Sequence, residues 1–168
     1  SPMADGRLVF FGLQGVLRWL LVDMFNDGFF NRPQEEVVEE YLRLMDSYLG
    51  PGMVSAEHIR ALHKLGYLPL HIKALDEGTK VPMQVPVLTI TNTHDAFFWL
   101  VNYLETVLCS ELWKSSTNAT IAHHYRRICE RWAQQTCVDT AHLDFQCHDF
   151  SFRGLSGLHE AAQAGSGH

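Results

Sequence analysis

Apolar residues recur every three or four positions in the first part of the chain, which is the spacing of helices that bury one face. The first predicted helix begins at Leu13 and ends near residues 26–28. The second begins at Pro33, which suits a first helical position, and the Gly50-Pro51-Gly52 run stops it. A third, shorter helix ends at Gly66, where a left-handed residue closes the last turn.

The apolar spacing then shortens to two residues, which is typical of strands. Alternation predicts one strand over Leu68–Ala74, a turn at 76–78 and a second strand over Val85–Thr91. Pro82 and Pro86 lack the backbone N–H that a central strand donates. We therefore expect an edge strand or a bulge in this pair.

The three-to-four spacing returns after the strands and predicts two more helices. Thr93 or Asp95 can cap the first of them. Its expected buried residues are Phe97, Phe98, Val101, Leu104 and Leu108. The expected buried residues of the second helix, over Ala119–Thr136, are Ile121, Tyr125, Ile128 and Trp132.

The chain ends in a predicted strand, turn and helix start. Residues 143–150 alternate like a strand, Ser151–Gly154 follow as a turn, and Ser156 can cap a closing helix. In α/β architectures, ligands bind beyond the carboxyl ends of strands. This junction is therefore the candidate binding site.

Four side chains at the junction can contact a flat ring attached to an anion. Phe150 can stack on such a ring for about 0.5–1.5 kcal/mol beyond area burial, and Arg153 can make charge-assisted bonds to phosphate or carboxylate. Asp149 can orient the arginine or a bound metal-phosphate group, and His148 can line the pocket. The alternative is a core aromatic, a local Asp149–Arg153 ion pair and a core histidine.

Composition and charge narrow the function classes. The chain has 168 residues, 46% apolar and 19% charged, which is typical of one globular domain. The net charge of −6 gives no positive field to collect nucleic acid. Gln14, Arg18 and Asp23 interrupt the longest apolar stretch, so no membrane span is expected. With no signal-peptide cleavage pattern, we expect a cytoplasmic protein.

The four cysteines form no zinc pattern, because no Cys-x-x-Cys pair is present. We expect reduced thiols that are buried or half-buried. His123-His124 and Cys147-His148 are adjacent in sequence, and adjacent side chains point in different directions. No protein-held metal is therefore expected.

The run His148-Asp149-Phe150-Ser151-Phe152-Arg153-Gly154 closely resembles a motif of the nicotinamide phosphoribosyltransferases, the bacterial type in particular. Four other stretches resemble the same family in the same order, so the resemblance covers nearly the whole chain. They are 9–14, 68–78, 85–92 and 98–106.

The resemblance implies a type II phosphoribosyltransferase with an α+β (α/β) fold. Residues 1–140 would be part of an N-terminal helix-and-sheet domain, and residues 141–168 would begin a β/α barrel. The implied reaction joins nicotinamide to the ribose of phosphoribosyl pyrophosphate and gives nicotinamide mononucleotide and pyrophosphate, in NAD salvage. Mg²⁺ would come with phosphoribosyl pyrophosphate, ATP would be an activator, and a homodimer would share its active sites.

By the same resemblance, Phe150 stacks on nicotinamide, Arg153 faces the carboxamide and phosphate side, and His148 and Asp149 line the pocket or its channel. The family's chains are longer, so we expect this segment alone to be inactive. Two alternatives stay open, namely a nicotinate phosphoribosyltransferase and a non-catalytic module for dimerisation or ligand binding.

Overall fold

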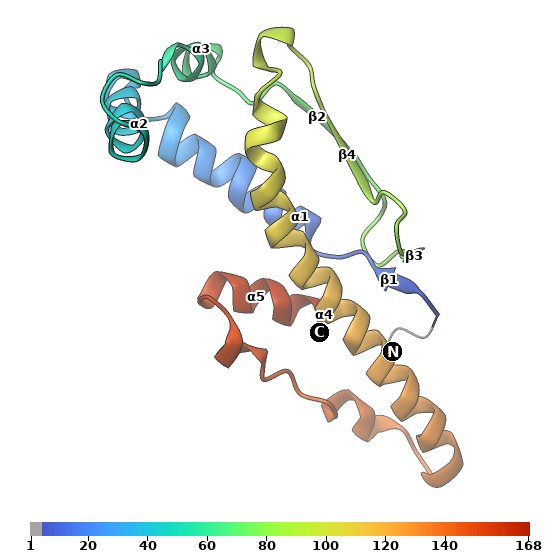
Figure 1. Ribbon diagram of the computed structural model, residues 1–168. Helices are drawn as coiled ribbons and strands as arrows, with labels where there is room; N and C mark the ends of the chain where they lie inside the picture. The colour runs from blue at the N-terminus through green and yellow to red at the C-terminus, as the bar shows by residue number, and fades with distance from the viewer. Residues whose placement is uncertain (1–4) are drawn as a thin grey trace. The chain divides into compact units, whose positions relative to one another are not determined.

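The computed structural model describes residues 5–168, which divide into two compact units. One unit comprises the described residues through Gly15 together with Lys73–Thr89 and Glu105–His168, and the other comprises Val16–Ile72 and Ile90–Leu104. Figure 1 shows the elements in chain order. The observed class is a mixture of helices and small two-stranded sheets.

The helices of the second unit agree with the predicted periodicity. They include α2 (Gln34–Leu49) and α3 (Glu57–Leu65), and Gly66 closes α3 in the left-handed conformation, as predicted. Val37, Val38 and Ile59 form a buried cluster with Ala56. Part of the apolar stripe that predicted these helices is thus the face that they bury against each other, whereas Leu44 and Tyr48, further along α2, are exposed.

The first helix runs further than its sequence suggests. After α1 (Leu13–Val16) it winds more widely, with π-helical turns in η1 (Leu17–Met24) and η2 (Asn26–Phe30). The amide of Asn31 donates to the carbonyl of Asn26, five residues back, at 2.8 Å. Packing of Phe29 on Phe30, with ring centroids 4.9 Å apart, stabilises these last turns despite Gly28.

Residues 5–168 contain two antiparallel strand pairs. β2 (Leu70–Ala74) pairs with β4 (Leu88–Asn92), close to the predicted strands. β1 (Arg7–Val9) pairs with β3 (Lys80–Pro82), with Leu8 opposite Val81. Among residues 5–168 each strand has one strand neighbour, so both strands of the predicted pair, β2 and β4, are edge strands, as expected. Pro82 lies in β3, which was not predicted.

Helix α4 (Leu100–Thr136) replaces the two separate helices that were predicted. No glycine or proline interrupts its 37 residues, so nothing in the sequence breaks the helix. His94, not Thr93 or Asp95, caps the preceding turn η3 (Asp95–Phe97), because its ring Nδ1 accepts from the amide of Ala96 at 3.2 Å. Phe98 precedes α4 and is exposed, contrary to prediction.

The second half of α4 carries a largely exposed stripe. Tyr125, Ile128 and Trp132 were predicted to be buried, and about half of each is exposed. Within the described chain, the short turn η4 (Ala141–Phe145) lies against this part of α4 and covers it incompletely. The predicted apolar stripe is present on this part of α4. Whether it is buried depends on which segments pack against it, and the periodicity of the stripe does not determine that.

The cysteines are more exposed than expected. Cys109, Cys137 and Cys147 are exposed, and Cys129 is half-buried; all four are free thiols. The expectation of buried or half-buried thiols therefore holds for Cys129 alone.

The first unit is held together where α4 meets the N-terminal strand. The hydroxyl of Thr120 accepts from the amide of Val9 at 2.8 Å, and the hydroxyl of Ser116 accepts from the amide of Phe11 at 3.1 Å. Phe10, between them, is fully buried. The side chains of α4 thus satisfy backbone amides that a wider sheet would otherwise satisfy.

The predicted strand over 143–150 is wrong. This segment contains η4 and an irregular stretch, followed by the turn η5 (Ser151–Gly154) and helix α5 (Leu158–Gly167). A strand needs a neighbour for its backbone hydrogen bonds, and no described strand pairs with these residues. No barrel is therefore evident in residues 5–168, although the closing helix was predicted correctly.

Helix α5 meets α4 at the C-terminal end of α5, as Figure 1 shows. The side-chain amide of Asn118 donates to the carbonyl of Ala164 at 2.5 Å. Glu160, which is 9% exposed, forms an ion pair with Lys114 and accepts from the amide of Ser156. Ser156 was expected to cap α5 with its side chain. It instead contacts the start of α5 through its backbone amide, and no side-chain cap is formed.

We expect Lys114→Met to destabilise the chain by about 1–2 kcal/mol, because the nearly buried carboxylate of Glu160 would lose its cation while Lys114 itself is partly solvated. The urea midpoint of unfolding measures this change. Arg18→Met is the control, since its pair with Asp23 is exposed and a change below about 0.5 kcal/mol is expected. Equal shifts in both variants would contradict the prediction.

Two findings bear on function class. Within residues 5–168, no helix is both long enough and apolar enough to cross a membrane. Nor does any group of three or more His, Cys, Asp or Glu side chains in that range form a cluster that could hold a metal ion.

Candidate functional site

The candidate residues lie between η4 and α5, and Asp149 is the one with the most contacts. Its carboxylate accepts from the Ser151 amide at 2.8 Å and from the Ser151 hydroxyl at 3.0 Å. The side-chain amide of Asn118, on α4, donates to it at 3.2 Å. Asp149 therefore starts the turn that follows and ties this segment to α4.

These hydrogen bonds also favour the ionised form of Asp149. The hydrogen bond from the Ser151 amide lowers the pKa of Asp149 below its usual value, with further lowering by the Ser151 hydroxyl and by Asn118, against partial desolvation. Asp149 is thus a carboxylate at neutral pH, suited to accept hydrogen bonds and not to donate a proton.

The lowered pKa predicts a pH dependence of stability. Stabilisation by the Asp149 charge is fully present above the unfolded-state pKa of about 3.9 and is lost as the pH falls through the lower folded-state pKa. The difference in stability between the unmodified chain and Asp149→Asn should therefore shrink below about pH 4. Urea unfolding of both proteins at a series of pH values measures it, and a difference that grows on acidification would contradict this account.

Phe150 presents its ring to solvent. The side chain is 73% exposed, and the ring of His148 stands edge-on to it, with centroids 6.4 Å apart and planes at 89°. Phe152 is also exposed. The alternative that these aromatics are core residues is therefore wrong for the described chain, and the face of Phe150 is open to a ligand.

Arg153 follows in η5 and is exposed. Among residues 5–168 no ion pair or hydrogen bond joins it to Asp149, so the alternative of a local Asp149–Arg153 pair is also wrong. The structure thus brings His148 next to Phe150 and leaves the guanidinium of Arg153 available on the neighbouring turn.

Asn118 is the site residue that sequence reasoning missed. It lies 31 positions before Asp149 and contacts both Asp149 and α5. The available signal was an asparagine in the interior of a long helix, where its helix propensity is low. An asparagine in a helix interior is favoured where its side-chain amide forms hydrogen bonds, as that of Asn118 does here.

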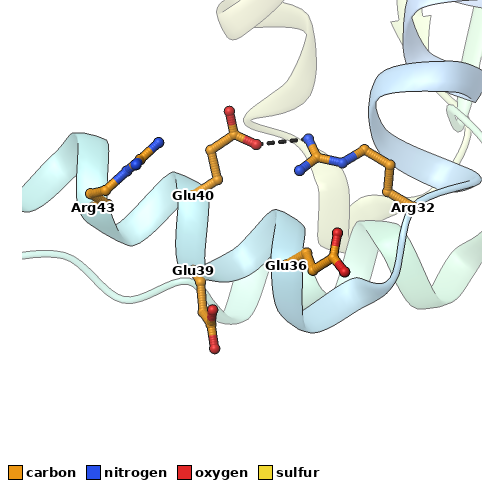
Figure 2. A pocket seen from close by; sticks show the side chains of 5 residues that line it. All are labelled: Arg32, Glu36, Glu39, Glu40 and Arg43. Carbon is orange, nitrogen blue, oxygen red and sulfur yellow. Dashed lines mark hydrogen bonds and ion pairs between the residues drawn. The ribbon is translucent and has the colours of Figure 1, made fainter.

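A separate charged hollow lies on α2, in the other unit. Figure 2 shows the five side chains that line it, namely Arg32, Glu36, Glu39, Glu40 and Arg43. The guanidinium of Arg32 donates to Glu40 at 2.7 Å and lowers the pKa of that carboxyl. Since this pairing keeps Glu40 ionised, the hollow has the character of a solvated charged surface and not of an acid–base centre.

Comparison with known proteins shows what the chain as a whole is similar to. No family model matches the chain. A nicotinamide phosphoribosyltransferase of Acinetobacter baylyi is 56% identical over 164 residues, which cover 98% of this chain and 32% of that protein. The chain is homologous to nicotinamide phosphoribosyltransferases. The resemblance predicted from the sequence is thereby confirmed.

Two further nicotinamide phosphoribosyltransferases extend the comparison. The Xanthomonas campestris protein is 32% identical over 96% of this chain and 33% of its own length. The Mycoplasma genitalium protein is 37% identical over 64% of this chain and 24% of its own length. The chain thus spans about a third or less of the curated relatives it matches.

Proposed function

We propose that the chain is part of a nicotinamide phosphoribosyltransferase, which transfers phosphoribosyl from phosphoribosyl pyrophosphate to nicotinamide and releases pyrophosphate. The observation that carries this proposal is 56% identity over 98% of the chain to an enzyme of that name. The exposed ring of Phe150 beside an ionised Asp149 supports it, because a planar, polar ring needs a stacking face and hydrogen-bond acceptors.

In this proposal Phe150 stacks on nicotinamide, and Arg153 faces the carboxamide and phosphate side of the pocket. His148 and Asp149 line the pocket or its channel. Glycosyl transfer from a pyrophosphate passes through an oxocarbenium-like state, so catalysis consists mainly of positioning and of neutralising the leaving group. No nucleophilic serine or cysteine is required.

Mg²⁺ enters this proposal with phosphoribosyl pyrophosphate and not as a resident ion. Activation by ATP, a homodimer with shared sites, a cytoplasmic location and a β/α barrel that begins near residue 141 belong to the same proposal.

A product assay tests the function. A polypeptide of the relatives' full length that contains this chain is offered nicotinamide or nicotinate with phosphoribosyl pyrophosphate and Mg²⁺. We expect the mononucleotide from nicotinamide. Product from nicotinate alone would favour the alternative of a nicotinate phosphoribosyltransferase. Product from neither acceptor would favour a non-catalytic binding module.

We expect the 168-residue chain alone to give no product in this assay, since it spans about a third of the enzymes it resembles. Chromatography of the reaction mixture measures product directly, with the full-length polypeptide as the positive control. Turnover by the isolated chain would contradict the expectation.

A further inference from the structure

Two cysteines that are distant in sequence meet beside the candidate site. The sulfurs of Cys129, on α4, and Cys147, directly before His148, are 3.8 Å apart. Both border a hollow of about 150 Å³, which Tyr125 and Arg126 also line. Cys147 is exposed and Cys129 is half-buried, so a small oxidant can reach the pair.

We propose that Cys129 and Cys147 are a thiol pair that a peroxide oxidises to an intramolecular disulfide. The proposal does not depend on the enzymatic function above. A disulfide has its sulfurs about 2.05 Å apart, so the two must approach by a little under 2 Å. Residues 146–150 form no regular helix or strand, so side-chain rotation with a small shift of this stretch closes the gap.

The chemistry proceeds in two balanced steps. Cys147 releases its proton, the resulting thiolate attacks one oxygen of hydrogen peroxide, and the O–O bond breaks. The departing hydroxide takes up the released proton, so that a sulfenic acid and one water form. The sulfur of Cys129 then attacks the sulfenic sulfur, the S–O bond breaks, and the departing hydroxide takes the Cys129 proton as a second water. Two thiols are oxidised, and one peroxide is reduced to two waters.

The local contacts assign the two roles. The hydrogen bond with Cys147 raises the pKa of Cys129, and burial raises it further, so Cys129 keeps its proton. Cys147 is the more exposed sulfur and has the freer path to the oxidant. Cys147 is therefore the residue that is oxidised first, and Cys129 is the resolving thiol.

The other cysteines have different neighbours. The sulfur of Cys137 lies 3.5 Å from the hydroxyl of Thr136 and 4.0 Å from the ring of His142. In an unfolded chain Cys137 would nevertheless be the preferred partner, because it is only eight positions from Cys129. Closing the 18-residue separation of Cys129 and Cys147 is about three times less favourable by loop entropy alone. A preference for Cys147 is thus a signature of the folded structure.

The test oxidises the reduced 168-residue chain with one equivalent of hydrogen peroxide, blocks remaining thiols and digests without reductant. Cleavage after Arg and before Asp places Cys129 in 128–131, Cys137 in 132–138 and Cys147 in 144–148. We expect the 128–131 peptide linked to 144–148 to dominate in mass spectra, and the 128–131 to 132–138 link to dominate after oxidation in concentrated urea.

Matched variants complete the test. Cys129→Ser and Cys147→Ser should abolish the link, whereas Cys109→Ser and Cys137→Ser should keep it. In Cys129→Ser, dimedone should label a sulfenic acid at Cys147. The proposal is overturned if native oxidation leaves both thiols free, carries them to sulfinic acid, or links Cys129 to Cys137 as often as to Cys147.

Discussion

Phe150→Ala, in a polypeptide of the relatives' full length, should lower kcat/KM for nicotinamide by about 100-fold. Stacking contributes about 0.5–1.5 kcal/mol beyond the burial of an aromatic ring, and the two together amount to about 2–3 kcal/mol. Each 1.4 kcal/mol is a factor of about ten. Steady-state production of nicotinamide mononucleotide measures the loss, which a ring that is 73% exposed without ligand should cause without unfolding the protein.

Phe152→Ala is the matched control for this prediction. Phe152 lies two residues away and is also exposed, at 54%, yet the family resemblance gives it no stacking role. Phe150→Tyr should retain most activity, because the stacking face is kept. Equal losses for Phe150→Ala and Phe152→Ala, or full activity of Phe150→Ala, would show that the ring is not the platform.

The elements that the sequence predicted well are those with a clear local pattern. Helices α2 and α3 have a regular apolar stripe and a stop at glycine, and both lie where the stripe placed them. Strands β2 and β4 follow the alternating residues. Strand β1, with only three residues, is too short for a period to be recognised and was missed.

The errors arose where structure depends on partners distant in sequence. Alternation over 143–150 is compatible with a strand, but a strand requires a neighbouring strand, and the described residues supply none. The two helices predicted after the strands are a single helix, α4 (Leu100–Thr136). No residue in Leu100–Thr136 breaks the helix.

In the candidate site, too, the residues close in sequence were predicted and the distant contact was not. The motif identified His148, Asp149, Phe150 and Arg153, all within six consecutive residues, so their nearness needed no knowledge of the fold. The partner that holds Asp149 is Asn118, from a helix 31 positions earlier. Such a contact follows from how α4 and the final segment meet, and local pattern does not encode it.

Gly12→Ala should destabilise the chain by about 3 kcal/mol, the largest stability effect that we expect from a single methyl group here. Gly12 has φ of +102°, which L residues rarely adopt, and a Cβ at this position would lie 2.6 Å from the Cβ of Ser115 on α4. Ser115 is fully buried, so it has no space into which to move. The urea midpoint of unfolding, with an unchanged slope, measures the effect.

Two companion variants separate backbone strain from the steric clash. Gly6 also has positive φ, +62°, but nothing lies within 4 Å of an added Cβ, so Gly6→Ala should cost only about 1 kcal/mol. Ser115→Gly removes the atoms that the methyl group added at position 12 would strike. Combining it with Gly12→Ala should therefore recover part of the loss, despite the cost of about 1 kcal/mol for glycine in a helix. Additive effects of the two substitutions would mean that Gly12 and Ser115 are not in contact, and the packing of the N-terminal segment on α4 would have to be revised.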